Sequence, residues 1–256
     1  MPTNFDEEKN ILKFANDLDT RQCMILSDYE NSENYIKTAD IISTILSNDY
    51  LKIWRDNSHS NLPPDFINEK DSLMMEIMRV DDHSIDGKNN PLLKKEKDMH
   101  RELREITKNM QNLELVFCNP VTDLPTEEDH NYRNYYKSFQ RTIRKHKSKI
   151  NKYRTNHPNK KLIFFIMDET SGVYFEKTDD SMVRLHLPFY DEKFIKEFID
   201  SDIDYLIHFC PFNYYQSIGG HYNLPKLIIF DIKHLKYGKM LKIEKYDENR
   251  MISSER

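Results

Sequence analysis

The chain has 256 residues and a formal net charge of -5, and this length allows one large domain with its own core. Charged residues make up 32% of the chain, but aromatic residues make up 12%, which excludes a generally disordered protein. Only five glycines are present, and none lies in a Gly-x-Gly-x-x-Gly or P-loop pattern, which excludes the common nucleotide-binding loops.

Cysteine content and apolar runs set the expected compartment. The cysteines Cys23, Cys118 and Cys210 are odd in number and widely spaced, which is typical of reduced thiols in the core of a cytosolic protein. No apolar run reaches the ~20 residues that a membrane span needs, and the first residues lack a signal-peptide pattern. We therefore expect a cytoplasmic protein with no membrane association.

Two helices are predicted in an N-terminal part that covers residues 1–50. Apolar side chains recur at helical spacing over residues 5–18 and again over residues 33–48. The short apolar run from Leu51 to Trp54 is predicted to begin a sheet core that extends over residues 51–235.

A carboxylate lies inside the next apolar run, Leu73 to Val80, which is predicted to be a strand buried on both faces. Strand alternation places Glu76 on the same face as Met74 and Met78. An ionised carboxylate there costs several kcal/mol unless a metal ion, a cation or several donors meet it. The sequence therefore predicts a partner for Glu76.

A second carboxylate precedes this strand. Pro64-Asp65 begins a short segment that a turn at Asp71-Ser72 folds back as the antiparallel neighbour of the strand. This hairpin brings Asp65 towards Glu76, so that two carboxylates converge on one surface of the sheet.

Pro-Asp followed by an acid on the next strand resembles the motif of the PD-(D/E)XK nuclease family. Asp65 and Glu76 match the two acids that hold a divalent cation in that family. The resemblance implies a restriction-endonuclease-like core, hydrolysis of nucleic acid that depends on Mg²⁺ or Mn²⁺, and catalytic and metal-binding roles for both acids.

The chain departs from the family pattern at the lysine that follows the second acid by two residues, because Met78 stands there. A lysine from elsewhere, such as Lys37 or Lys70, is one replacement, and Glu33 is the nearest candidate for a further acid on the preceding helix. In a purely structural alternative, one acid pairs with a buried Arg or Lys and the other caps a turn.

After Pro91 the sequence predicts an amphipathic helix, because six apolar residues between Leu92 and Leu113 recur at helical spacing. Leu115 to Cys118 is predicted to be a short strand, and residues 119–130 an acidic surface loop.

Residues 131–155 form a predicted helix with one aromatic and apolar stripe and basic remaining faces. Eleven Lys or Arg and no Asp or Glu lie between Arg133 and Lys161. Such a face is typical of proteins that follow a phosphate backbone, and the alternative is a solvated face that offsets the acidic remainder. The predicted nucleic-acid contacts are Arg141, Arg144, Lys145, Lys147, Lys149 and Lys152.

Lys161 to Met167 is the most apolar segment and is predicted to be a central strand that ends in Asp168-Glu169. An apolar strand closed by two acids resembles the Walker B element of ATPases, but that function requires a P-loop, which the chain lacks. Gly172–Glu176 and Met182–Leu187 are predicted to extend the sheet, and a helix is predicted at Phe194–Ile199.

Two further buried strands are predicted at Tyr205–Cys210 and Lys226–Ile232, and His208 in the first of them is predicted to be a core residue. The triplet Asp231-Ile232-Lys233 places an acid and a lysine on one face and is a rival site for the nuclease-like motif. The charged tail, residues 236–256, is predicted to be mobile over its last dozen residues.

These elements together predict a single α/β domain over residues 1–256, with a mixed central sheet of about six strands flanked by helices. The leading functional hypothesis is a PD-(D/E)XK-like protein that hydrolyses phosphodiester bonds in nucleic acid. The competing hypothesis is a non-enzymatic interaction protein of the same fold, which binds a protein partner or nucleic acid through charged surfaces.

Overall fold

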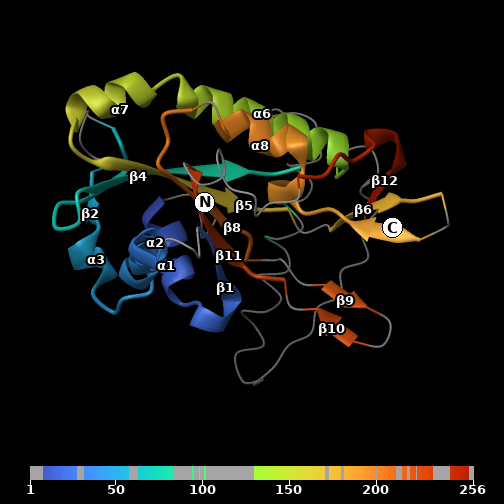
Figure 1. The fold of residues 1–256 in the computed structure, drawn as a ribbon, viewed down its shortest axis with the longest axis horizontal. Helices are drawn as coiled ribbons and strands as arrows, with labels where there is room; N and C mark the ends of the chain where they lie inside the picture. The colour runs from blue at the N-terminus through green and yellow to red at the C-terminus, as the bar shows by residue number, and fades with distance from the viewer. Residues whose placement is uncertain are drawn as a thin grey trace.

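A mixed seven-stranded sheet forms the centre of the molecule, and helices cover both of its faces (Figure 1). The predicted α/β class is therefore confirmed, with one strand more than expected. The computed structural model describes residues 8–27, 32–57, 63–82, 94, 98, 101, 130–170, 173–179, 182–199, 201–211, 215–217, 220–222, 224–232 and 243–253.

The central strands of the sheet run parallel to one another, and antiparallel strands lie on both sides of them. Strand β4 is parallel to β5, and β5 is parallel to β8, whereas β3 is antiparallel to β4 and β11 is antiparallel to β8. In sheet order the strands are β1 (Cys23–Leu26), β11 (Leu227–Asp231), β8 (Tyr205–Phe209), β5 (Lys161–Asp168), β4 (Leu73–Val80), β3 (Phe66–Asn68) and β2 (Arg55–Asp56).

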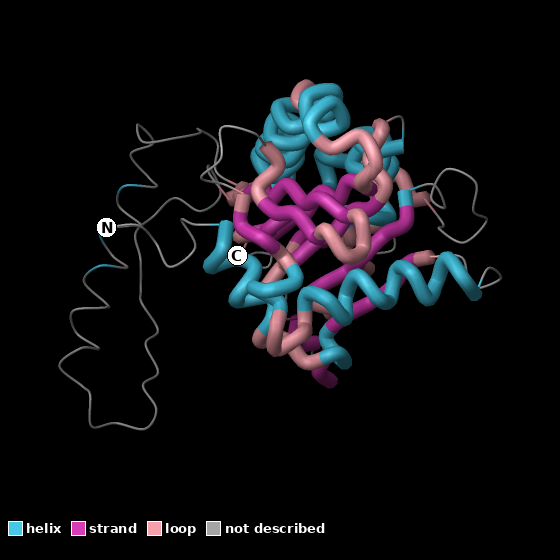
Figure 2. Tube along the Cα trace, turned by 90° about the vertical axis from the view of Figure 1, so that its left-hand side faces the viewer, coloured by secondary structure: helices cyan, strands magenta, loops and turns pink. Residues whose placement is uncertain are grey.

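The two faces of the sheet carry separate apolar cores. Helices α1 (Glu8–Asn16), α2 (Ser32–Ile45) and α3 (Tyr50–Ile53) pack on the face that includes Met75 and Ile77. The opposite face, which includes Met74 and Met78, is covered by α6 (Tyr132–Lys147), α7 (Ile150–Asn156) and α8 (Glu192–Ile199). Figure 2 shows the strands between these two layers of helices.

Smaller elements lie beside the main sheet. Strands β12 (Met251–Ser253), β6 (Tyr174–Lys177) and β7 (Val183–Leu185) form a second, antiparallel sheet. Strands β9 (Tyr215–Ser217) and β10 (Gly220–Tyr222) form a hairpin. The 3-10 helices are η1 (Thr20–Gln22), η2 (Pro188–Tyr190) and η3 (Glu248–Arg250).

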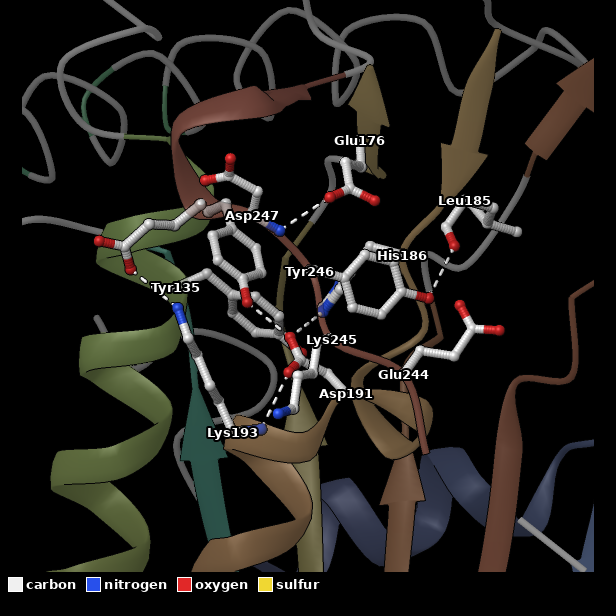
Figure 3. Close-up of polar contacts among 12 residues, drawn as sticks. Tyr135, Glu176, Leu185, His186, Asp191, Lys193, Glu244, Lys245, Tyr246 and Asp247 are labelled. Carbon is white, nitrogen blue, oxygen red and sulfur yellow. Dashed lines mark hydrogen bonds and ion pairs between the residues drawn. The ribbon is translucent and has the colours of Figure 1, made fainter. Parts of the chain in front are cut away.

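The C-terminal segment is fixed to this second sheet by polar contacts (Figure 3). The Tyr246 hydroxyl donates to the Leu185 carbonyl at 3.1 Å, and the Asp247 amide donates to Glu176 Oε1 at 2.8 Å. Met251–Ser253 then pairs with β6. The prediction that the last dozen residues are mobile is therefore wrong for residues 245–253, because backbone pairing with a free strand edge does not depend on the charge of the side chains.

Two strand predictions are also wrong. Leu51–Trp54 lies in helix α3 and in the residue that ends it, because Tyr50, Ile53 and Trp54 at helical spacing all turn towards the core. Gly172–Glu176 and Met182–Leu187 do not extend the main sheet, because both edges of β5 are already paired with β4 and β8. Their strands β6 and β7 therefore form the separate sheet.

Other predictions are confirmed within three residues, including the helices at residues 33–48 and 194–199 and the buried strands β4, β5, β8 and β11. The predicted turn at Asp71-Ser72 joins β3 to β4, and Ser72 adopts the left-handed conformation with φ 54°. Most of the helix predicted after Pro91, the strand at 115–118, residues 119–129 and Lys233 lie outside the described residues.

Candidate functional site

The predicted convergence of Asp65 and Glu76 follows from the register of the β3–β4 hairpin. Asn68 pairs with Leu73, Ile67 with Met74 and Phe66 with Met75. Asp65 is the residue just before this ladder, and its side chain reaches the backbone of β4 at Ile77, the residue that follows Glu76. The structure therefore brings the two predicted site residues together.

The Asp65 carboxylate is held at the strand edge. Its Oδ2 atom accepts a hydrogen bond from the Ile77 amide at 2.8 Å. Burial, followed by the charge of Glu76, raises the pKa of Asp65 to about 7, although the Ile77 hydrogen bond and the charge of Lys149 oppose this rise. Near neutral pH, Asp65 therefore exchanges a proton readily, and a cation could replace that proton.

Glu76 is 4% exposed, and its two oxygens have different surroundings. Oε1 lies 2.8 Å from His146 Nδ1 and 3.8 Å from Lys149 Nζ. Oε2 has no hydrogen-bond partner among the described residues, and neither does the hydroxyl of the buried Tyr153. Burial, the charge of Glu76 and a side-chain interaction with the Glu76 carboxylate raise the pKa of Tyr153, so a protonated phenol lies close to Glu76. A buried carboxylate oxygen that no donor meets with hydrogen-bond geometry requires another partner, and the protonated Tyr153 hydroxyl beside it and a bound cation are the two candidates.

A break between two helices brings His146 and Lys149 to this carboxylate. Helix α6 ends at Lys147, where the Ser148 amide donates to the Arg144 carbonyl at 3.1 Å. His146 lies in the last turn of α6, and Lys149 is the N-cap residue of α7. The single helix predicted over residues 131–155 is therefore two helices, and the break between them faces the middle of β4.

Lys149 is the lysine that approaches the carboxylate pair. Met78, at the position of the family's lysine, is 3% exposed and packs in the apolar core below α6. The expected replacements Lys37 and Lys70 are wrong, because both line a pocket formed with α2 and the start of β4. The weak candidate Glu33 forms an exposed ion pair with Lys37 at 2.5 Å.

The basic residues predicted to contact nucleic acid differ in their partners. Arg144 forms an ion pair with Glu197 at 3.0 Å, and Lys147 Nζ donates to the Glu197 carbonyl at 2.7 Å. Lys145 and Lys152 are exposed and have no ion pair within the described part of the chain. Arg141 is exposed as well. The predicted basic surface exists on α6 and α7, and its role in binding stays a prediction.

A second polar cluster was not predicted. It consists of three buried aspartates. Each carboxylate accepts a hydrogen bond from one tyrosine hydroxyl at 2.5 Å. Each also lies within 3.0 Å of one histidine ring nitrogen. We call it the Asp-Tyr-His cluster. Its groups are Asp82 with Tyr174 and His130, Asp168 with Tyr135 and His208, and Asp191 with Tyr132 and His186.

Residues within or next to the Asp-Tyr-His cluster supply the hydrogen-bond partners of its buried carboxylates. Asp168 also accepts from the Thr170 amide and hydroxyl, and its hydrogen bonds lower its pKa against the effect of burial. The same balance lowers the pKa of Asp191. His208 is buried, as predicted, but its ring is bonded to Asp168 and is not merely a small core residue. Since the donors already meet each carboxylate, we assign this cluster to structure.

The rival acid Asp231 is buried at the end of β11, opposite Tyr205, and its predicted lysine lies outside the described residues. Among the described residues no group of three or more His, Cys, Asp or Glu is arranged to hold a metal ion. A cation bound by Asp65 and Glu76 would therefore need water or substrate oxygens as its remaining ligands.

Comparison with known proteins adds no assignment to this geometry. No protein-family model, curated protein or solved structure matches the chain. Within the described ranges, no helix is both long enough and apolar enough to cross a membrane.

Proposed function

We propose that this protein hydrolyses phosphodiester bonds in nucleic acid at the pair Asp65 and Glu76, in the manner of the PD-(D/E)XK nucleases. The observation that carries the proposal is the buried Glu76 Oε2, which has no hydrogen-bond partner among the described residues and lies beside Ile77, whose amide is bonded to the Asp65 carboxylate. Two adjacent carboxylates, one with a raised pKa, are typical of a catalytic centre.

The residues present fit a divalent cation. Asp65 and Glu76 would hold Mg²⁺ or Mn²⁺, and Mg²⁺ is commonly bound by one or two carboxylates together with water and substrate phosphate. When bound, such an ion lowers the pKa of an attacking water and offsets the charge of the scissile phosphate. Buried oxygens that would otherwise repel one another are then neutralised.

The chain's own side chains have distinct roles in this proposal. His146 holds Glu76 through Oε1 and so leaves Oε2 for the cation. Lys149, which is half-buried beside Glu76, supplies the positive charge that Met78 cannot, and it would stabilise the charge that develops on the phosphate. Arg141, Lys145 and Lys152, exposed on the same two helices, would contact the phosphate backbone.

A nuclease assay with Mn²⁺ tests the proposal. We expect cleavage of DNA or RNA by the wild type, and a loss of at least about 100-fold in Asp65→Asn and Glu76→Gln, because one preorganised charged group commonly contributes 10²–10³ in rate. Glu69→Gln is the matched control, since Glu69 is an exposed acid in the turn of the same hairpin. Cleavage that survives both carboxylate substitutions would place the active site elsewhere.

The competing function is binding without chemistry, to nucleic acid or to a protein partner. It is favoured by Met78 and by the neighbouring His146 and Lys149, which already offset the charge of Glu76. Nucleic-acid binding by the wild type, with no cleavage in Mn²⁺ and no change in melting temperature on adding millimolar Mn²⁺, would support this alternative, because a ligand of the native state must stabilise it.

A further inference from the structure

A pocket of about 610 Å³ lies beside helix α2, at the start of strands β4, β5 and β8. Small-molecule sites commonly measure roughly 300–1,000 Å³, so this pocket has the size of a ligand site. It is formed on the α2 face of the sheet, whereas Glu76 lies on the α6 face. The residues that line the pocket are Lys37, Asp40, Ile41, Ser43, Thr44, Ser47, Ile53, Lys70, Asp71, Leu73, Lys161 and Tyr205.

The lining combines apolar side chains with positive charge. Ile41 and Leu73 are buried members of the core on this face, and Ile53 packs against them. Three lysines reach the pocket from separate elements: Lys37 from α2, Lys70 from the β3–β4 turn and Lys161 from the first residue of β5. A ligand that suits this lining has an apolar part and a negative group.

Among the described residues, neither acid of the lining, Asp40 or Asp71, forms an ion pair with a lysine of the lining. Lys161 Nζ donates to the Tyr205 hydroxyl at 3.2 Å and lies over the Tyr205 ring. In the part of the chain that the structure describes, Lys70 and Lys161 form no ion pair, and Lys37 pairs only with Glu33, which is outside the lining. The lining acid Asp71 instead accepts a hydrogen bond from Asn68 at 2.8 Å.

We propose that this pocket binds a small organic phosphate such as a nucleotide. The lining holds three lysines and two aspartates, so its net charge is positive, and phosphate oxygens form strong charge-assisted hydrogen bonds with ammonium donors. The exposed ion pair of Lys37 with Glu33 is weak, so Lys37 can turn to the phosphate at little cost. The apolar part of the ligand rests on the isoleucines and leucine of the lining.

Calorimetric titration with ADP tests the proposal, using the full chain in EDTA at about 50 mM salt, where charge is only partly screened. We expect binding by the wild type, and affinity at least tenfold lower in Lys70→Gln/Lys161→Gln, because that variant loses two charge-assisted hydrogen bonds to the phosphate. The control Lys9→Gln/Lys13→Gln removes two exposed lysines of α1 and should bind within twofold of wild type. Adenosine, which lacks phosphate, should bind at least tenfold more weakly than ADP.

Absence of ADP binding at millimolar concentration would overturn the proposal, and so would a Lys70→Gln/Lys161→Gln variant that binds as wild type does. All four lysines are exposed, so their replacement should leave the melting temperature unchanged. Glu76→Gln should bind ADP as wild type does, which separates this pocket from the proposed nuclease site. Loss of ADP binding in Glu76→Gln alone would assign the ligand to the carboxylate pair instead.

Discussion

At the scale of single residues, the placement of Asp65 and Glu76 lowers the stability of the fold. The two carboxylates lie close enough for the charge of Glu76 to act on Asp65, and one Glu76 oxygen has no hydrogen-bond partner among the described residues. Burial and mutual repulsion raise the pKa of Asp65 to about 7, far above its value in an unfolded chain. Residues that lower stability in this way are expected where function requires them.

The raised pKa of Asp65 has a definite consequence for stability. Between the unfolded value of 3.8 and about 7 the folded state binds more protons, so Asp65 makes stability fall as pH rises through this window. Asp65→Asn keeps an acceptor for the Ile77 amide but removes the charge. In EDTA at pH 8 we expect the variant to have a higher melting temperature than the wild type. The rise should be about 2–4 °C for each kcal/mol by which the free energy of unfolding increases.

The advantage of Asp65→Asn should shrink as the pH is lowered to 5, where Asp65 is protonated in the folded wild type. Mn²⁺ should reverse the order at pH 8, because it stabilises the wild type and not the variant. Thermal unfolding followed by circular dichroism measures both effects. A variant that melts below wild type at pH 8 in EDTA would contradict the unfavourable placement of Asp65.

At the scale of elements, the sequence predicted the buried strands, the β3–β4 hairpin and the helices on both faces, but not the side chains that contact Glu76. Alternation along Leu73–Val80 sufficed to place Glu76 on one face, and the turn residues sufficed to place Asp65 near it. The cations could not be predicted, because the approach of Lys149 depends on a helix break at Ser148 that leaves the apolar stripe of residues 131–155 uninterrupted. The Asp-Tyr-His cluster depends on contacts between residues 33 to 92 positions apart as well as on near neighbours.

The basic surface of α6 and α7 gives a prediction at this scale. Lys145 and Lys152 are exposed and lie on either side of the helix break, whereas Arg144 is held by Glu197. Lys145→Gln/Lys152→Gln should therefore lower the salt dependence of nucleic-acid affinity by about two units in slope, since each neutralised phosphate contributes close to one. Binding measured by fluorescence anisotropy across a salt series gives this slope.

Lys9→Gln/Lys13→Gln on α1 is the control for the basic surface, because it removes the same charge from the opposite side of the sheet. Its slope should stay within half a unit of wild type. Equal slopes for the two double variants would mean that α6 and α7 do not contact the nucleic acid.

At the scale of the whole molecule, the second sheet and the C-terminal segment are joined to the main domain through buried polar contacts. Asp191 is 0% exposed and follows η2, just before α8. Its carboxylate contacts the Tyr132 hydroxyl at the start of α6, His186 after β7, and the Lys193 amide in α8. Glu244 pairs with the backbone on both sides of Asp191, because its amide donates to the Tyr190 carbonyl and its carbonyl accepts from the Glu192 amide.

Asp191 should therefore be a major determinant of global stability. Asp191→Ala removes the acceptor of the buried Tyr132 hydroxyl and of the Lys193 amide and the partner of the buried His186 ring, and breaking a buried charged network commonly costs about 3–5 kcal/mol. We expect a loss of this size in the free energy of unfolding by urea, with Asp191→Asn less severe because it retains one acceptor oxygen. Asp202→Ala is the control, since that carboxylate is 77% exposed and pairs with Arg154 at the surface. If both alanine variants unfold at the same urea concentration, then α6, the segment after β7 and α8 are held together by apolar contacts and not by Asp191.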